Sequence, residues 1–534
     1  MRGADLLVEA LKAAGVTRIY SLSGNQIMPV YDACFEAGVE IVHTRHEAAA
    51  VYMAEAHAQL TGSIGVAMVT AGAGAANALG PLFTATESET PVLLLTGDSP
   101  VSQDGRGAFQ EMDQVPMTAP LTKLSLRPRS AGQLGNAVAK SVRTATSGRP
   151  GPVHIALPFD VVEEDAGDAR VPTAHELARD AMALREGDAR LITQAIAAAK
   201  KPIVLCGPVM SATRSGDLKA KLQQALNAPV IAMESPRGLK DPSLGALADL
   251  LQQADLVVTL GKRVDFTLGF GKTGAFDPAA RWISIQPDMK ERDRAHLNLG
   301  ERLKMNFHAD PRDAAATLIE TGDGSNVHGE WLEAVSSKLM RRAATPSSSD
   351  RITPDQLCAA VQRKIDATDN AILISDGGEF GQWAQAGITA SRRVVNGVSG
   401  AIGGGLCYGL AAAKLFPQST IFSMMGDGTA GFHLSELETA ARVGAPYVLV
   451  IGNDMRWNAE HQIQLRDYGA DRLIACDLSD GRYDLVATAL GGHGEFVTEL
   501  SELDGALERA VNSGKVACVN VLIDGLPAPS GPSH

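Results

Sequence analysis

Short apolar runs alternate with longer segments of helical periodicity along this chain, and that alternation constrains its fold more than any other feature. In the first part of the chain, Ala-rich stretches of helical periodicity separate the strand-like runs at residues 17–22, 64–70 and 91–97. A short, wholly apolar run is typical of a strand covered on both faces, and a helix between two such strands returns the chain so that they run parallel. The pattern continues into the last third of the chain, so the sequence predicts an α/β fold of parallel sheets flanked by helices.

Polar segments divide this pattern into three blocks. A chain of 534 residues has room for about three domains at roughly 100–200 residues each. The first block closes with a strand inside GRPGPVHIALPFDV at 148–161, and a segment rich in Ser and Pro at 344–350 precedes the last block. The second block holds the strand-like runs 202–207, 228–233, 255–261 and 281–286. We therefore predict three domains, at residues 1–165, 188–335 and 353–534.

The charge balance narrows the range of partners. The chain carries 61 acidic against 48 basic residues, a formal net charge of −13, whereas nucleic acids and anionic membranes attract clustered Lys and Arg. We therefore expect neither as a partner, and an anionic ligand must be held by backbone amides, a metal ion or a few placed cations. No apolar stretch approaches the roughly 18 residues of a membrane span, and the six cysteines form no C-x-x-C pair. A cytoplasmic protein with reduced thiols is the expectation.

The most specific chemical signal is a glycine–aspartate–glycine turn in the third block. The run at 420–425 reads as a strand, Gly426-Asp427-Gly428 follows it, and a helical stretch spans 433–444. A second strand at 446–452 then ends at Asn453-Asp454. Because parallel strands end at one edge of a sheet, where such sheets bind ligands, Asp427 and Asp454 should meet there. Two oxygen ligands beside a glycine turn suit Mg²⁺ or Ca²⁺ with a phosphate group, since glycine lets the backbone approach phosphate oxygens.

This arrangement resembles the signature of thiamine-diphosphate-dependent enzymes, which runs from GDG to a terminal Asn-Asn. The resemblance implies that Asp427 and Asp454 bind the Mg²⁺ that anchors the diphosphate, with the backbone carbonyl of Arg456 as a further ligand. Asp454 departs from the family, which has Asn there, but a carboxylate is still an oxygen donor. The resemblance also places around the cofactor Gly426, Gly428, Thr429 and Trp457.

Glu47 supplies an independent match in the first block. It lies in IVHTRHEAAAVYMAEA at 41–56, after a short strand and at the start of an Ala-rich helix. On its own it would be an acidic residue that favours a helix N-terminus by about 0.3–1 kcal/mol. In thiamine-diphosphate enzymes, a glutamate in this R-H-E context hydrogen-bonds the pyrimidine ring and promotes the tautomer that generates the reactive carbanion. The resemblance therefore implies that Glu47 is a catalytic residue.

Three further segments follow the family's cofactor-binding pattern. TAGAGAANALG at 70–80 resembles a cofactor loop, with Ala73 in place of Pro, and implies contacts by Thr70, Gly74 and Asn77. SDGGEFGQW at 375–383 resembles the diphosphate-side loop and implies contacts, mainly through the backbone, by Gly378, Glu379 and Phe380. GAIGGGL at 400–406 resembles the loop that bends the cofactor, with Gly400 and with Ile402 where acetolactate synthases usually carry Met.

The substrate side of the pocket is expected to be polar with aromatic edges. GAFQEMDQVP at 107–116 resembles the family's segment next to the substrate, which implies a role for Phe109 and makes Gln110 a second catalytic candidate. The same pocket would include Asn25, Gln26, Trp383, Glu460 and His461. For Glu460 and His461, an ordinary amphipathic helix remains the alternative.

The resemblance covers nearly the whole chain and is nearest to acetolactate-synthase-like enzymes. FQE, TKLSLRP at 122–128 and GRPGPVHIALPFDV fit that group, which removes CO₂ from a 2-oxo acid and transfers the two-carbon remainder to a second carbonyl. A 2-hydroxyacyl-CoA lyase or oxalyl-CoA decarboxylase is the alternative, because LGKRVDFTLGFG at 260–271 and the GAFQEMDQV segment resemble that branch too. A thiamine-diphosphate-binding protein without catalysis is a third reading. The substrate would be a small 2-oxo acid, an aldehyde or an acyl-CoA.

The resemblance also implies a quaternary structure and a doubt about a second cofactor. In this superfamily the cofactor lies between the first domain of one subunit and the third domain of its partner. We therefore expect a homodimer or homotetramer, with Glu47 and Asp427 of each site on different chains. FAD binds the central domain of acetolactate synthases, but Gln286 stands where an acidic residue commonly ends the strand, so FAD is not expected here.

Overall fold

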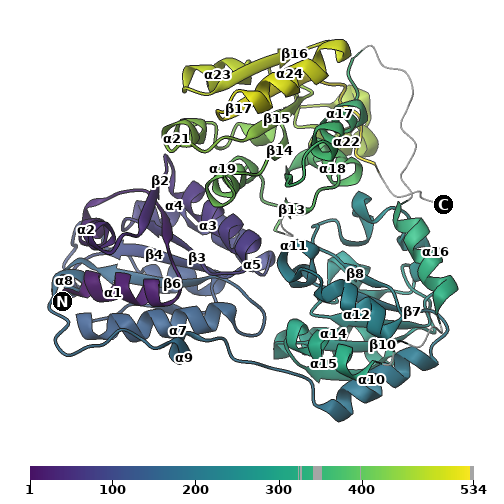
Figure 1. Cartoon of the computed structure of the whole chain (residues 1–534), viewed down its shortest axis with the longest axis horizontal. Coiled ribbons are helices and arrows are strands. Elements are labelled where there is room, and N and C mark those ends of the chain that lie inside the picture. Colours follow the sequence, from purple (N-terminus) through teal and green to yellow (C-terminus); the bar gives the residue numbers. More distant parts are fainter. Residues whose placement is uncertain (323, 325–327, 341–350, 397–398, 530–534) are drawn as a thin grey trace.

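Three parallel sheets, each flanked by helices, form the framework of the chain (Figure 1). The computed structural model describes residues 1–322, 324, 328–340, 351–396 and 399–529, so the predicted linker at 344–350 lies outside the described residues. Every pairing between named strands is parallel. The predicted fold class, α/β with parallel sheets flanked by helices, is therefore confirmed.

The first sheet has the strand order β2-β1-β3-β4-β6-β5. Its strands are β1 (Arg18–Ser21), β2 (Glu40–His43), β3 (Gly65–Val69), β4 (Val92–Asp98), β5 (Ser125–Leu126) and β6 (Val153–Pro158). Its helices are α1 (Gly3–Ala13), α2 (Met28–Ala37), α3 (Glu47–Thr61), α4 (Ala73–Asn77), α5 (Leu79–Glu87), α6 (Gln114–Thr118), α7 (Leu134–Thr146), α8 (Phe159–Glu163) and α9 (Ala174–Leu177). β3, β4 and β6 are buried throughout, which is why most of their residues are apolar.

The third sheet repeats the topology of the first, although no sequence repeat is visible. Its order is β13-β12-β14-β15-β17-β16, the first sheet's order shifted along the chain. Its strands are β12 (Ile372–Asp376), β13 (Arg392–Val395), β14 (Ile421–Gly426), β15 (Val448–Asn453), β16 (His493–Val497) and β17 (Ala517–Leu522). Its helices are α17 (Pro354–Asp366), α18 (Gly378–Gly387), α19 (Gly405–Leu415), α20 (Asp427–Ala430), α21 (Glu436–Arg442), α22 (Asn458–Tyr468), α23 (Tyr483–Ala489) and α24 (Leu500–Asn512).

The central sheet has the order β11-β10-β9-β7-β8. Its strands are β7 (Pro202–Cys206), β8 (Val230–Ala232), β9 (Leu256–Leu260), β10 (Arg281–Gln286) and β11 (Leu303–His308). Its helices are α10 (Glu186–Ala198), α11 (Ala212–Ser215), α12 (Leu218–Leu226), α13 (Ala248–Leu251), α14 (Met289–Leu299), α15 (Pro311–Thr321) and α16 (Gly329–Met340). Among the described residues, no helix is long and apolar enough to cross a membrane.

The helix predicted over 433–444 is wrong at its start, because α21 begins only at Glu436. The single turn of α20 follows β14, and residues between α20 and α21 contact another loop. Nδ1 of His433 donates a hydrogen bond to the carbonyl oxygen of Gly403 at 2.8 Å. This segment is therefore used to hold the loop around residue 403, which a helical pattern in the sequence does not reveal.

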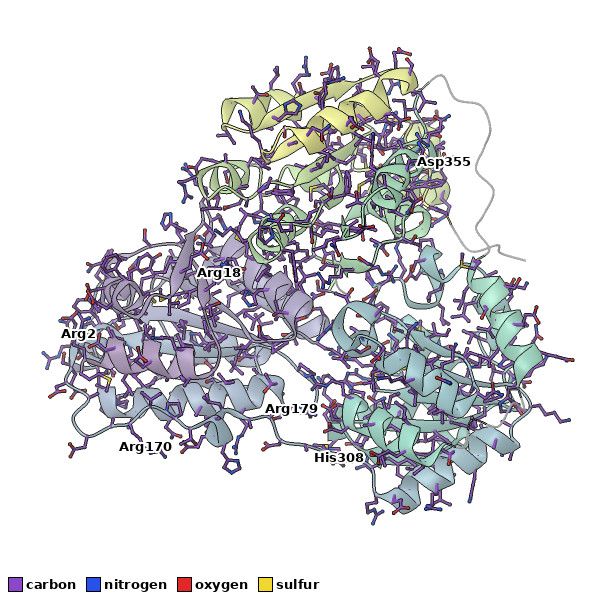
Figure 2. The ribbon with its side chains drawn as sticks, in the orientation of Figure 1. Arg2, Arg18, Arg170, Arg179, His308 and Asp355 are labelled. Atoms are coloured by element: carbon purple, nitrogen blue, oxygen red, sulfur yellow. The ribbon has the colours of Figure 1, made fainter. Side chains whose placement is uncertain are left out.

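Charged contacts fasten the first domain to the central domain. Arg179, labelled in Figure 2, lies in the segment between these two domains and donates to Asp313 of the central domain at 2.9 Å. Arg149 reaches from the first domain to Asp288 and to Gln286, each at 2.8 Å. Arg149 is mostly buried, and its rigid guanidinium fork holds two partners at once. The relative position of the two domains is thus fixed by oriented polar contacts as well as by packing.

Helices α3 and α19 pack together and join the first domain to the third within one chain (Figure 1). Because α3 is rich in Ala, most of its side chains are small, and every residue from 48 to 56 is buried. Tyr52 and Tyr408 meet edge to face with ring centres 5.8 Å apart. Tyr408 donates to the fully buried Glu55 at 2.8 Å. The interface therefore contains a titratable carboxyl group.

Glu55 should make stability fall as pH rises. Burial raises its pKa from 4.5 to about 7, although hydrogen bonds from Ser88 and Tyr408 act the other way. The native state then holds a proton that the unfolded state releases between these two values, so unfolding free energy is lost as pH rises through this window. The loss is about 3 kcal/mol and complete by about pH 8. Glu55→Gln should flatten this dependence in urea unfolding measured at about pH 5 and about pH 8.

An exposed glutamate of the same domain provides the control for that experiment. Glu9, whose side chain is 43 % exposed, should give the wild-type dependence when changed to Gln. An unchanged pH dependence in Glu55→Gln would show that Glu55 does not titrate in this window.

Candidate active site

Asp427 and Asp454 meet at the carboxyl edge of the third sheet. Gly426 and Gly452 are register partners in β14 and β15, and each aspartate is the first residue after its strand. The two side chains are 1 % and 6 % exposed. Oδ2 of Asp427 is buried and has no hydrogen-bond partner within the described residues. The strand topology thus brings together the two residues that the sequence predicts as metal ligands.

This pair of carboxyl groups fits a divalent cation. Burial raises the pKa of both, and the negative charge of Asp427 raises the pKa of Asp454 further. A cation between them would relieve the repulsion and give Oδ2 of Asp427 the partner that it lacks. No group of three or more His, Cys, Asp or Glu side chains in the described part of the chain could hold a metal ion. The remaining ligands here would therefore be oxygens of the backbone, of water or of a bound phosphate.

A cavity of about 190 Å³ opens directly beside the two aspartates. Four loops of the third domain and one residue of the central domain, Arg237, line it. The residues of its wall that the sequence predicts for the cofactor or pocket are Gly378, Glu379, Phe380, Gly400, Ile402, Gly426, Asp427, Gly428, Thr429, Asp454, Arg456, Trp457 and Glu460. Every cofactor residue predicted in the third domain therefore faces one space.

Glycine is required at Gly428 of this wall and at Gly377, which precedes the wall residue Gly378. At Gly428 a Cβ atom would lie 2.8 Å from the ring of Trp457. Gly377 has φ +61°, and a Cβ atom there would lie 2.5 Å from Oγ1 of Thr429. Any larger residue would push these loops apart, so the bare backbone can approach a bound diphosphate closely.

Asp376 and Asn396 hold the loop that carries Ile402, and neither was predicted as a site residue. Oδ2 of Asp376 accepts hydrogen bonds from the backbone of Gly403 at 2.9 Å and of Gly405 at 2.7 Å. Asn396 donates to Oδ1 of Asp376 at 2.5 Å and to the carbonyl of Ala401. One feature of the sequence could have identified Asp376 as a site residue. It ends strand β12, at the same edge of the sheet as Asp427.

Asn453 shapes the loop after the second aspartate. It is fully buried, and its Oδ1 accepts from the backbone of Met455 at 3.1 Å. Met455 has φ +59°, a left-handed conformation that is unfavourable for a residue with a side chain. The hydrogen bond from its backbone to Asn453 helps to hold that conformation, and so fixes where Asp454 and Arg456 lie.

The predicted residues of the first domain form a second cluster. Asn77 donates to Oε2 of Glu47 at 3.1 Å. Thr70 donates to Gln26 at 2.6 Å, and Gln26 donates to Oε1 of Gln110 at 2.8 Å. This chain of hydrogen bonds leaves the amide N–H groups of Gln110 as donors for a ligand. Gly74 lies next to Thr70 and Glu47, since a Cβ atom there would be 2.8 Å from the first and 3.5 Å from the second.

Glu436 of the third domain fixes the start of the helix that begins with Glu47. Its Oε1 accepts from the backbone of Arg45 at 2.9 Å and of His46 at 3.0 Å. His46 then caps α3 by accepting from the backbone of Ala48 at 3.1 Å. Sequence reasoning missed Glu436, since only the packing of the two domains brings it to α3.

Some predicted pocket residues lie elsewhere. Trp383 packs into the hydrophobic core of the third domain. It lines neither the cavity beside Asp427 nor a second cavity, of about 290 Å³, that adjoins it. It lies on α18 between Gln382 and Gln385, and a helix turns an intervening residue to another face. His461 is also buried and lines neither of these two cavities, whereas Glu460 lines the cavity beside Asp427. Phe109 and Asn25 are exposed, Phe109 to 78 %.

Gln286 is engaged inside the central domain. It is fully buried, accepts from Arg149, and donates to the backbone carbonyl of Lys262 at 2.7 Å. Both halves of its amide are therefore occupied by the protein. The prediction that FAD is absent stays a prediction.

The fold and the site together define a class of protein: an α/β enzyme that binds a diphosphate cofactor between loops at a sheet edge. Family comparison agrees. Residues 1–117, 190–318 and 376–521 match, in this order, the N-terminal TPP binding domain, the central domain and the C-terminal TPP binding domain of thiamine pyrophosphate enzymes. The chain belongs to the thiamine pyrophosphate enzyme family, and it is a thiamine-diphosphate-dependent enzyme that acts on carbon–carbon bonds.

The relatives of this chain are named either as acetolactate synthases or as 2-hydroxyacyl-CoA lyases. The probable acetolactate synthase of Mycobacterium bovis is 30 % identical, over 98 % of this chain and 96 % of its own length. The 2-hydroxyacyl-CoA lyase 2 of Caenorhabditis elegans is 30 % identical, over 98 % of this chain and 89 % of its own. The acetolactate synthase isozyme 1 large subunit of Escherichia coli is 29 % identical, over 98 % and 94 %. The predicted resemblance to the acetolactate-synthase-like group is thus confirmed.

Proposed function

We propose that this chain is a thiamine-diphosphate- and Mg²⁺-dependent decarboxylase and carboligase of 2-oxo acids, acetolactate synthase-like and cytoplasmic. The observation that carries the proposal is the buried pair of Asp427 and Asp454 at the cavity where the predicted diphosphate residues converge. When bound, thiamine diphosphate supplies the nucleophile that attacks the substrate carbonyl and the electron sink that makes decarboxylation possible.

The chain's own residues would bind, orient and manage protons. Asp427 and Asp454 would hold the Mg²⁺, and the backbone around Gly428 would bind the diphosphate. Ile402 would pack against the cofactor. Glu47 holds a proton at the pyrimidine ring nitrogen. Gln110, oriented by Gln26, offers its amide N–H groups to an oxygen of the substrate.

The active site in this proposal is shared between two chains. Among the described residues that line the cavity beside Asp427, none comes from residues 1–165, whereas Glu47 and Gln110 lie in that domain. A partner's first domain would complete each site in a homodimer or homotetramer. Exposed apolar side chains support such contacts, since Phe109 is 78 % exposed, Tyr468 64 % and Ile474 72 %.

The second candidate is a 2-hydroxyacyl-CoA lyase, favoured by the relatives that carry this name at similar identity over the whole chain. Both candidates use the same cofactor and the same Glu47. They differ in the substrate: a 2-oxo acid has a carboxylate on its keto carbon, whereas the carbonyl of a 2-hydroxyacyl-CoA belongs to the coenzyme A thioester itself.

Pyruvate consumption by the purified protein, with thiamine diphosphate and Mg²⁺ added, tests the proposal. Formation of acetolactate is the expected result, and omission of Mg²⁺ after chelation should abolish it. If pyruvate is not consumed by protein that has bound the cofactor, the proposed reaction is wrong. Cleavage of a 2-hydroxyacyl-CoA would then identify the second candidate.

A further inference from the structure

A second cavity, which we call the side chamber, adjoins the cavity beside Asp427. It measures about 290 Å³ and lies between the central and third domains. The two spaces share Arg237, Gly378, Gly400 and Ile402 as wall residues. Its size is at the lower end of the roughly 300–1,000 Å³ typical of ligand pockets. The side chamber therefore suits one end of a ligand whose other end lies beside the cofactor.

The side chamber carries one charge, and it is positive. Arg237 is the only charged residue in its wall, as far as the described residues go. The nearest carboxylate to Arg237 is that of Glu379 at 4.0 Å, and the arginine side chain is 44 % exposed. Other interdomain arginines are more tightly paired: Arg263 lies 2.7 Å from Glu87, and Arg393 lies 2.6 Å from Glu234. Arg237 thus keeps donors for a carboxylate or phosphate, which a guanidinium binds through two hydrogen bonds.

Two residues of the chamber wall, Gln385 and Asn396, each have a buried acceptor without a partner in the described part of the chain. Oε1 of Gln385 and Oδ1 of Asn396 have no hydrogen-bond partner within the described residues, and the two residues are 8 % and 5 % exposed. The amide of Asn396 cannot be reversed, because its nitrogen already donates to Asp376 and to the carbonyl of Ala401. A buried acceptor without a partner is unfavourable, so an N–H or O–H group of a ligand would complete it.

We propose that the side chamber binds the non-reacting end of the substrate: an anionic group on Arg237, with a neighbouring N–H or O–H group on Asn396 and Gln385. This rests on the proposed function, because the reacting carbonyl must then lie at the cofactor in the adjoining cavity. The shared chemistry is a carboxylate or phosphate next to a hydrogen-bond donor. A hydroxylated acid and the amide-containing arm of a coenzyme A thioester are its two sources.

Binding to the holoenzyme tests this directly with two probes that have no reactive carbonyl, glycerate and coenzyme A, by titration calorimetry. At least one should bind, and Arg237→Ala should weaken it about 10- to 100-fold, the size of a charge-assisted contact. Arg237 also lines the cofactor cavity, so the affinity for thiamine diphosphate is measured in the same variant and should fall by less than the affinity for the probe. Gln385→Leu should weaken the probe about 2- to 10-fold without lowering stability, since it removes an unpaired buried acceptor.

Arg190→Ala is the matched control, because Arg190 is an exposed arginine of the central domain that pairs with Glu186. It should leave probe binding unchanged. Binding of coenzyme A would assign a thioester substrate, and binding of glycerate a hydroxylated acid. The proposal is overturned if neither probe binds, if Arg237→Ala binds normally, or if this variant loses thiamine diphosphate to the same extent.

The same variant tests the side chamber and the proposed function separately. Pyruvate turnover with an unchanged KM in Arg237→Ala, together with normal probe binding, would keep the reaction and reject the side chamber. Probe binding that depends on Arg237, without pyruvate consumption, would keep the side chamber and reject the reaction.

Discussion

Replacing Glu47 by Gln should lower kcat by about 100- to 10,000-fold, the range expected for loss of a general acid–base group. Glu47 begins α3, and its Oε2 accepts from Asn77 at 3.1 Å. Glutamine has the same size and keeps an oxygen for Asn77, but it cannot hold or release a proton at the pyrimidine nitrogen. Steady-state turnover, together with the thiamine diphosphate content of the purified variant, measures the effect.

The cofactor content of the Glu47→Gln variant shows why its activity is lost. Loss of turnover with the cofactor retained supports a catalytic role, whereas loss of both would make Glu47 a binding residue. Full activity would reject the mechanism and favour a protein that binds the cofactor without using it. Glu36→Gln, an exposed glutamate of the same domain, should behave as wild type.

Replacing Asp427 by Asn should weaken binding of Mg²⁺ and thiamine diphosphate about 100-fold, because a charged ligand of the metal is lost. The apoprotein should not lose stability, since the substitution removes one of two buried like charges. Cofactor affinity by calorimetry and thermal unfolding of the apoprotein together measure the effect. A destabilised apoprotein would show that the aspartate holds the loop rather than a cation.

Asp454→Asn is the matched control for that experiment. It keeps an oxygen donor at the same place and restores the family's usual residue, so cofactor affinity should stay within about tenfold of wild type. If both variants lose cofactor affinity equally, the assignment of Asp427 as the principal ligand of the metal is contradicted.

The Glu47 and Asp427 variants also test whether two chains share each site. A dimer that combines one chain of each kind would contain one site with both native residues. Coexpression should therefore restore about a quarter of wild-type activity for random pairing. If each site lay within one chain, the mixture would stay inactive.

The fold class and the metal-binding edge were predictable from the sequence alone. Buried parallel strands such as β4 and β14 are mostly apolar, and that is a local property of the sequence. Once these runs are strands, the topology of parallel sheets places the residues after them at one edge, so Asp427 and Asp454 had to meet. The roles of Glu47 and Ile402 came from family resemblance rather than from local pattern.

Only the tertiary structure decided which other polar groups serve the site. Asp376 and Glu436 accept hydrogen bonds from the backbone of loops far along the chain, and for Glu436 nothing in its own neighbourhood indicates this. Arg237 reaches the cofactor cavity from the central domain, far along the chain from Asp427. Trp383 turned into the core instead of the pocket. The physical reason is that periodicity fixes which face of an element is buried, whereas a hydrogen bond or a cavity wall depends on which distant elements the packing brings within a few ångströms.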